Sequence, residues 1–315
     1  MFSTYDLGQF SQVLKDIRKS LNYTQNDVAT HTGLSTETLR KLENGKTIPK
    51  YDTIEILSLF YKTDLHSILN LCKSSTIIFD YYSKIDWLIT RVDSQEIKDT
   101  LSSFDLLKSN HLFNLIEKKE LAQLEFLIDG LKHSYLYDET SLIASIQTSN
   151  ELLIKALNVF IPTFSITEWE KYKYNYLELR ILFAIAANLG VIRECEQSNA
   201  ILEYVVNSLS YTSKAFHLEN VLISKIYATM SYNYHRLDQH QLALNAANTG
   251  IEFCNRHEIM TNLPLLLCRK GVALKLLDSD GYLEYLENAI VLLTIQGNHN
   301  LAAQYKKITD NYLNA

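Results

Sequence analysis

The chain has 315 residues, long enough for two domains or for one domain followed by an array of repeats. Hydrophobic residues make up 47% and charged residues 21%, which excludes a disordered chain, and only 3 Pro and 9 Gly argue against a turn-rich β protein. The net charge is −6, yet residues 1–70 hold eight basic and eight acidic side chains, so the remainder carries all of it. The composition predicts an all-α protein.

No segment predicts export or insertion into a membrane. No apolar run approaches the about 20 residues that a membrane-spanning helix needs. The first residues, Met1 to Asp6, lack the basic-then-apolar order of a signal peptide. We therefore expect a cytoplasmic protein without a membrane partner.

Five short helices are predicted in residues 1–73. The first carries an apolar stripe at spacings of three and four residues, from Phe10 to Leu21. Thr24 and Asp27 have the spacing of a capping box at the start of the second helix. Ser35 is placed to cap the third helix, and Asn44-Gly45 to end it with a left-handed cap. The predicted helices cover residues 7–21, 25–31, 35–44, about 54–60 and 65–71.

Several short motifs in this region resemble one family closely. They are Leu-x-x-Ile-Arg (14–18), Thr-Gln-x-x-Val-Ala (24–29), Thr-Gly-Leu-Ser (32–35), Leu-Arg-Lys-Leu-Glu-Asn-Gly-Lys (39–46) and Pro49. Together they resemble the Cro/C1-type, or XRE, helix-turn-helix family. The resemblance implies a five-helix, lambda-repressor-like domain that binds a double-stranded DNA operator. It also implies a semi-buried ion pair between Arg18 and Glu43.

Family positions predict which side chains face DNA. Gln25 begins the second helix, where a side chain touches a phosphate. Thr36, Glu37 and Lys41 fall on the exposed side of the third helix, where side chains meet base edges. Phosphate contacts are expected from the remaining polar side chains nearby, although some of these are alternatively plain solvated surface residues. The full predicted set is Gln25, Ser35, Thr36, Glu37, Arg40, Lys41, Asn44, Lys46 and Lys50.

The rest of the chain predicts a connector and a helical array. The polar stretch 73–76 marks a boundary, and an aromatic-rich segment across 74–94 predicts a connector helix. From 95 to 315, helices alternate with short polar breaks. Small residues at Ser231, Ala243, Gly250 and Gly271 fit the tetratricopeptide pattern, in which small side chains sit where paired helices cross. Ser231 and Gly271 lie 40 residues apart rather than 34, so a degenerate helical-hairpin solenoid is predicted.

This architecture resembles the peptide-pheromone-responsive regulators of Gram-positive bacteria, the group of PlcR, PrgX, NprR and the Rgg proteins. The resemblance implies a homodimeric transcriptional regulator in quorum sensing, whose concave repeat surface binds a short linear signalling peptide. Aligning Ser231, Gly271 and Ala187 with the small position of the tetratricopeptide pattern predicts which side chains lie on that surface. Among them, Lys225 or Arg269 could bind a carboxylate of the peptide. The predicted peptide-binding set is Arg180 (in an uncertain register), Asn188, Lys225, Thr229, Tyr232 and Arg269. Each of these residues could equally be an ordinary packing or surface residue.

No catalytic, metal or cofactor site is predicted. Cys72, Cys195, Cys254 and Cys268 are scattered and expected to be free, mostly buried thiols. Cys254-x-x-His257 is at most half a metal site. The chain has no glycine-rich phosphate loop, Gly-x-Ser-x-Gly elbow or His-Glu-x-x-His motif, so no enzyme activity is expected.

Two other functions stay open at this level. The chain could be a phage or mobile-element repressor that uses its repeats only for dimerisation. It could also be a tetratricopeptide protein that sequesters another protein and acts without DNA. The intact DNA-facing motif argues against the second, while the acidic repeat region, which DNA would repel, favours a partner other than DNA for that part of the chain.

Overall fold

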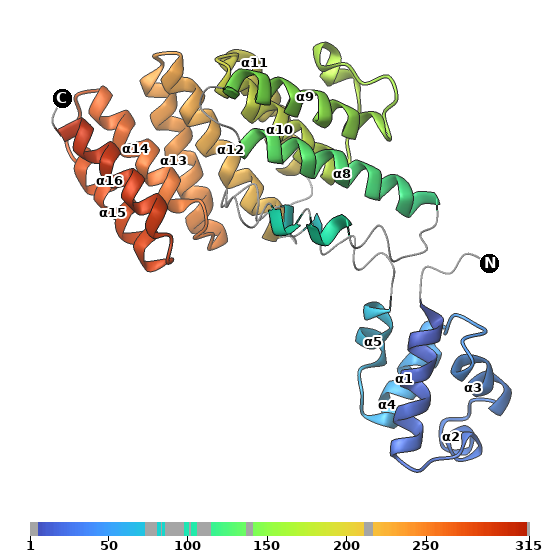
Figure 1. Ribbon diagram of the computed structural model, residues 1–315. Coiled ribbons are helices and arrows are strands. Elements are labelled where there is room, and N and C mark those ends of the chain that lie inside the picture. Colours follow the sequence, from blue (N-terminus) through green and yellow to red (C-terminus); the bar gives the residue numbers. More distant parts are fainter. Residues whose placement is uncertain are drawn as a thin grey trace. The chain divides into compact units, whose positions relative to one another are not determined.

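A computed structural model describes most of the chain (Figure 1). The described residues are 6–72, 81–82, 84–85, 98–100, 102–105, 115–136, 141–210 and 217–313. Every regular element within them is helical, which confirms the all-α prediction. The chain divides into two compact units, one containing α1–α5 and the other α9–α16, with the division inside α8. Most of the predicted connector, 74–94, lies outside the described residues.

The first unit is the predicted bundle of five helices. The helices are α1 (Leu7–Ser20), α2 (Gln25–Thr32), α3 (Thr36–Glu43), α4 (Tyr51–Tyr61) and α5 (Leu65–Leu71). Apolar side chains from all five meet in one core, which includes Leu14, Val28, Leu39, Leu57 and Leu65. Leu21 was expected in the stripe of the first helix but is 46% exposed, because α1 ends one residue earlier and Leu21 is its C-cap.

Local polar contacts set the ends of these helices. Thr24 and Asp27 form the predicted capping box at α2, and the Ser35 hydroxyl accepts the backbone N–H of Thr38 at the start of α3. Gly45 has φ +63°, the left-handed conformation predicted for the end of α3. A Cβ at Gly45 would lie 3.1 Å from the Leu7 carbonyl oxygen, so a small residue also lets this turn approach α1. The helix ends of this first unit, residues 6–72, are therefore set by contacts between residues close together in the sequence. This unit is called the head below.

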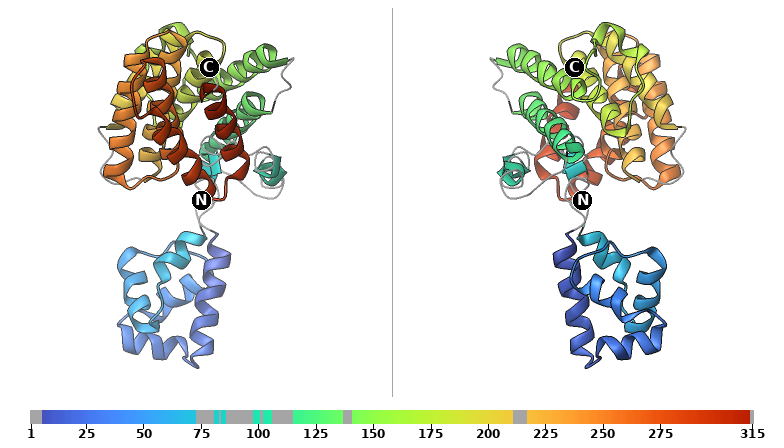
Figure 2. Two further views of the ribbon diagram at one scale, coloured as in Figure 1. Left: turned by 90° about the vertical axis from the view of Figure 1, so that its left-hand side faces the viewer. Right: turned by 90° about the vertical axis from the view of Figure 1, so that its right-hand side faces the viewer.

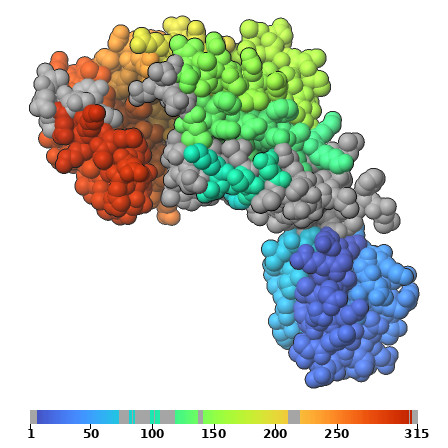
Figure 3. Space-filling model, viewed as in Figure 1, coloured from blue at the N-terminus to red at the C-terminus, as the bar shows by residue number. Residues whose placement is uncertain are grey.

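The second unit is a row of helices that pack side by side (Figures 1 and 2). Consecutive helices pack as pairs, and α12 also packs against α10 and α14. This pattern is that of stacked helical hairpins, as predicted, and Figure 3 shows the close packing of successive helices. The helices are α8 (Leu115–Tyr135), α9 (Leu142–Asn158), α10 (Tyr176–Val191), α11 (Cys195–Ser210), α12 (His217–Arg236), α13 (His240–His257), α14 (Leu263–Leu276), α15 (Tyr282–Ile295) and α16 (His299–Leu313), with a short 3-10 helix, η2 (Ile166–Lys171), before α10.

Small residues lie at the crossings within the pairs. The buried hydroxyl of Ser149 on α9 donates to the Gly130 carbonyl on α8, at 2.8 Å. The Ser231 hydroxyl on α12 donates to the Ala243 carbonyl on α13, also at 2.8 Å. On α14, a Cβ at Gly271 would lie 2.9 Å from the Tyr282 carbonyl oxygen. The predicted small-residue pattern therefore marks places where two helix backbones approach closely.

Three further observations bear on the sequence predictions. The four cysteines are free and buried, as expected. Among the described residues, no cluster of three His, Cys, Asp or Glu side chains could hold a metal ion. In the same residues, no helix is both long and apolar enough to cross a membrane.

Candidate functional site

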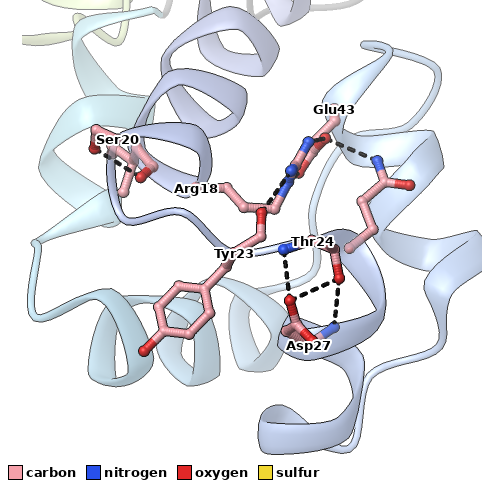
Figure 4. A network of polar contacts seen from close by, with 8 residues as sticks. Arg18, Ser20, Tyr23, Thr24, Asp27 and Glu43 are labelled. Carbon is pink, nitrogen blue, oxygen red and sulfur yellow. Dashed lines mark hydrogen bonds and ion pairs between the residues drawn. The ribbon is translucent and has the colours of Figure 1, made fainter.

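A semi-buried ion pair fixes the third helix in the head (Figure 4). Arg18 on α1 donates from Nε to Oε1 of Glu43 at 2.6 Å and from Nη2 to Oε2 at 2.8 Å. Burial disfavours the charge of Glu43, but the hydrogen bonds from Arg18 and Gln25 outweigh it and lower the pKa of this carboxyl. Since Glu43 ends α3, the pair ties α3 to α1, and it matches the pairing that the family resemblance implied.

Gln25 makes a contact within this domain in addition to the role predicted for it. Its Nε2 donates to Oε2 of Glu43 at 2.8 Å, and its side chain is half-buried. One N–H of the amide therefore supports the buried carboxylate, and the predicted phosphate contact concerns the second N–H of the same amide. The position in the family motif predicts that this side chain faces DNA. It could not reveal the bond to Glu43, because that bond joins residues 18 positions apart and forms only in the folded head.

One face of α3 is exposed and polar. Leu39, Leu42 and Glu43 point into the head, while the other side of the helix faces solvent. The predicted DNA-facing residues other than Gln25 are all exposed: Ser35, Thr36, Glu37, Arg40, Lys41, Asn44, Lys46 and Lys50. The Ser35 hydroxyl is occupied by its capping bond.

Ion pairs organise the charges on this face. Glu37 accepts two hydrogen bonds from the Arg40 guanidinium, at 2.7 and 2.8 Å. The Lys41 ammonium lies 3.6 Å from the same carboxylate. The hydrogen bonds from Arg40 and the two positive charges lower the pKa of Glu37 to about 2. A carboxylate on a surface that meets phosphates needs compensating donors, and Arg40 and Lys41 provide them.

In the second unit, three of the predicted peptide-binding residues lie together. Lys225 and Tyr232 are on α12, and Arg269 is on α14, which packs against α12. The Arg269 guanidinium carbon lies 4.6 Å from the centre of the Tyr232 ring. Burial, and then the charge of Arg269, lower the pKa of Lys225 to about 8. Thr229 lies one turn from Lys225 and donates its hydroxyl to the Lys225 carbonyl, so that hydroxyl is already engaged.

Asn188 and Arg180 lie inside the helical stack instead. Asn188 is 3% exposed, and its amide donates to Ser149 at 2.9 Å and to Asn150 at 2.8 Å, joining α10 to α9. Arg180 is fully buried, with its guanidinium carbon 3.3 Å from the centre of the Tyr176 ring. Asn188 is engaged in contacts between helices, and Arg180 is buried against Tyr176 of its own helix, so we remove both from the candidate peptide surface. Repeat register alone could not distinguish these positions from surface ones.

The comparisons with known proteins agree with this picture of the head. Residues 14–68, which run from the middle of α1 into α5, match the helix-turn-helix family. This stretch is a helix-turn-helix domain. It contains the ion pair, the capping box and the exposed face of α3. A comparison with curated protein sequences found no match.

Solved structures extend the likeness to the whole fold. PlcR from Bacillus thuringiensis, in a complex with the peptide PapR7 and DNA, is 14% identical with a TM-score of 0.66, covering 96% of this chain and 99% of PlcR. ComR from S. thermophilus, in a complex with DNA and its signalling peptide ComS, is 11% identical with a TM-score of 0.55, covering 96% of this chain and 99% of ComR. At this identity the likeness shows a shared fold: a helix-turn-helix head followed by stacked helices.

Proposed function

We propose that this chain is a sequence-specific DNA-binding transcriptional regulator controlled by a short linear peptide. The observation that carries the proposal is the exposed polar face of α3 within a helix-turn-helix domain. In this motif the second helix of the pair enters the major groove. The proposed organisation is a DNA-binding domain at 1–73, a connector at 74–94 and a peptide-binding and dimerisation domain at 95–315.

On the DNA side, we assign base contacts to Thr36, Glu37 and Lys41. Lys can donate to guanine, Glu can accept from the cytosine amino group, and Thr can contact the thymine methyl. The Glu37–Arg40 pair holds the carboxylate in place beforehand, so its charge does not oppose the approach to phosphates. The exposed cations Lys46 and Lys50 follow α3 and are assigned to the DNA backbone.

Mobility shift on the chain's own upstream DNA tests this assignment. Lys41→Ala is expected to relax base preference, whereas Lys46→Ala is expected to weaken binding to all sequences alike and to lower the salt slope by about one. A two-fold symmetric site is expected, because one α3 helix reads only a few base pairs and a homodimer doubles the site. If Lys41→Ala weakens specific and random DNA equally, Lys41 does not read bases.

On the peptide side, the support is the helical-hairpin stack and its likeness in fold to PlcR and ComR. The solved structures of those two proteins contain both DNA and a peptide. Stacked hairpins present an extended surface on their inner helices, which suits a linear peptide. The test is the same mobility shift with fractionated culture peptides. If no fraction alters DNA binding, the peptide control is wrong, while the DNA assignment stands on its own test.

A further inference from the structure

Two cations on neighbouring inner helices have no negative partner among the described residues. Lys225 on α12 is half-buried, and the nearest charge that shifts its pKa is that of Arg269 on α14, which is also positive. No ion pair joins either side chain to a carboxylate within the described ranges. Nε of Arg269 is buried and has no hydrogen-bond partner within the same ranges. Proteins rarely bury charges without pairing them, because desolvation of an unpaired charge is costly.

The titratable neighbours do not supply the missing negative charge. Burial and the charge of Arg269 lower the pKa of His235 on α12 to about 4, so this ring is neutral at pH 7. Burial raises the pKa of the Cys268 thiol, next to Arg269 on α14. Burial also raises the pKa of the Tyr305 phenol on α16, so it stays protonated. Arg236 on α12 is a further cation, and it donates to the Tyr232 hydroxyl.

The geometry of Arg269 suits a carboxylate. Its guanidinium is stacked on the Tyr232 ring, which restricts the plane of the fork. The ring is itself held by the contact with Arg236. Nε–H has no hydrogen-bond partner among the described residues, and a guanidinium pairs with a carboxylate through two of its N–H groups. Lys225 adds a flexible point charge beside it.

We propose that Lys225 and Arg269 form an anion subsite that receives a carboxylate of the bound peptide. This inference rests on the proposed peptide-binding function and adds its chemical class: the ligand must present a carboxylate, from its C-terminus or from an Asp or Glu side chain. Binding supplies the absent negative charge, so the subsite discriminates against ligands that are neutral at this point. Tyr232 is a positioning residue that orients Arg269.

The first experiment tests the subsite without the natural peptide. Thermal unfolding of the full chain is measured with N-acetyl-alanyl-alanine and with the corresponding amide, at equal ionic strength. The free acid is expected to raise Tm by about 2 °C at millimolar excess and the amide not to raise it. Arg269→Met and Lys225→Met are expected to abolish the response. Lys270→Met is the matched control, because Lys270 is the adjacent cation on α14 and lies over the Tyr285 ring instead.

The second experiment tests ligand class. The full chain is incubated with a heptapeptide library bearing free C-termini and with the same library amidated, and retained peptides are identified by mass spectrometry. A preference of about tenfold for free C-termini supports a terminal carboxylate, and enrichment of Asp or Glu in both libraries supports a side-chain carboxylate. Equal retention of neutral amidated peptides, or a preference that survives in Arg269→Met, overturns the subsite. If the free acid stabilises the chain but neither library is retained, the proposed peptide function fails and the anion subsite stands.

Discussion

Removing the charge of Glu43 should strongly destabilise the head. The Glu43 side chain is 1% exposed and that of Arg18 is 12% exposed, so both charges depend on each other rather than on water. Removal of one partner of a buried ion pair costs about 3–5 kcal/mol. Gln has the same shape and can still accept one bond, so Glu43→Gln is expected to cost about 2–3 kcal/mol. A domain of this size is stable by only about 3–10 kcal/mol, so the loss is a large fraction of the total.

The assay is urea unfolding of residues 1–73 at pH 7. Glu37→Gln is the matched control, because Glu37 also pairs with an arginine but the side chains of Glu37 and Arg40 are about half exposed (52% and 50%). Such surface pairs contribute at most about 1 kcal/mol, so the control should unfold almost like the parent. The reasoning is refuted if Glu43→Gln costs no more than Glu37→Gln.

Acid provides an independent check on the same pair. The folded head lowers the pKa of Glu43, so its contribution is present above the ordinary carboxyl pKa and is lost as pH falls below it. The difference in unfolding free energy between the parent and Glu43→Gln should therefore shrink as the pH falls from 5 to 3. A difference that stays constant over that range would mean that shape, rather than charge, explains the effect.

Three further outcomes are expected. Lys225→Met should stabilise the full chain by about 1–2 kcal/mol at pH 7, since folding lowers the pKa of Lys225 to about 8. The unfolded chain keeps that proton up to about pH 10.5, so the parent gains stability between pH 8 and 10.5. A variant that is less stable than the parent at pH 7 would contradict this. Gly271→Ala should destabilise the helical stack by about 1–3 kcal/mol in urea unfolding, because the added Cβ would lie 2.9 Å from the Tyr282 carbonyl oxygen. Unchanged stability would show that α14 and α15 can move apart to accept the Cβ. Residues 1–73 should fold alone but bind operator DNA weakly for lack of the dimerisation domain, and full-strength binding by the fragment would refute that.

The local features of this protein could be predicted from its sequence. The capping box at Thr24, the cap at Ser35 and the left-handed turn at Gly45 join residues a few positions apart, so short-range chemistry specifies them. The exposed face of α3 follows from helical periodicity in the same way. The Glu37–Arg40 pair is also local, at a spacing of three residues, and the sequence analysis missed it although i,i+3 pairing was available as a signal.

Only the tertiary structure decided the contacts between helices. The bond from the Gln25 amide to Glu43, 18 residues away, forms only in the folded head, and the family position of Gln25 could not reveal it. Asn188 fitted a surface position in the repeat, but α9 covers it and binds its side chain. Lys225 and Arg269 were separate candidates until α12 and α14 brought them together, without a counter-charge in the part of the chain that the structure describes. Periodicity tells which side of a helix is apolar, whereas the neighbour that a polar side chain meets depends on how distant helices stack.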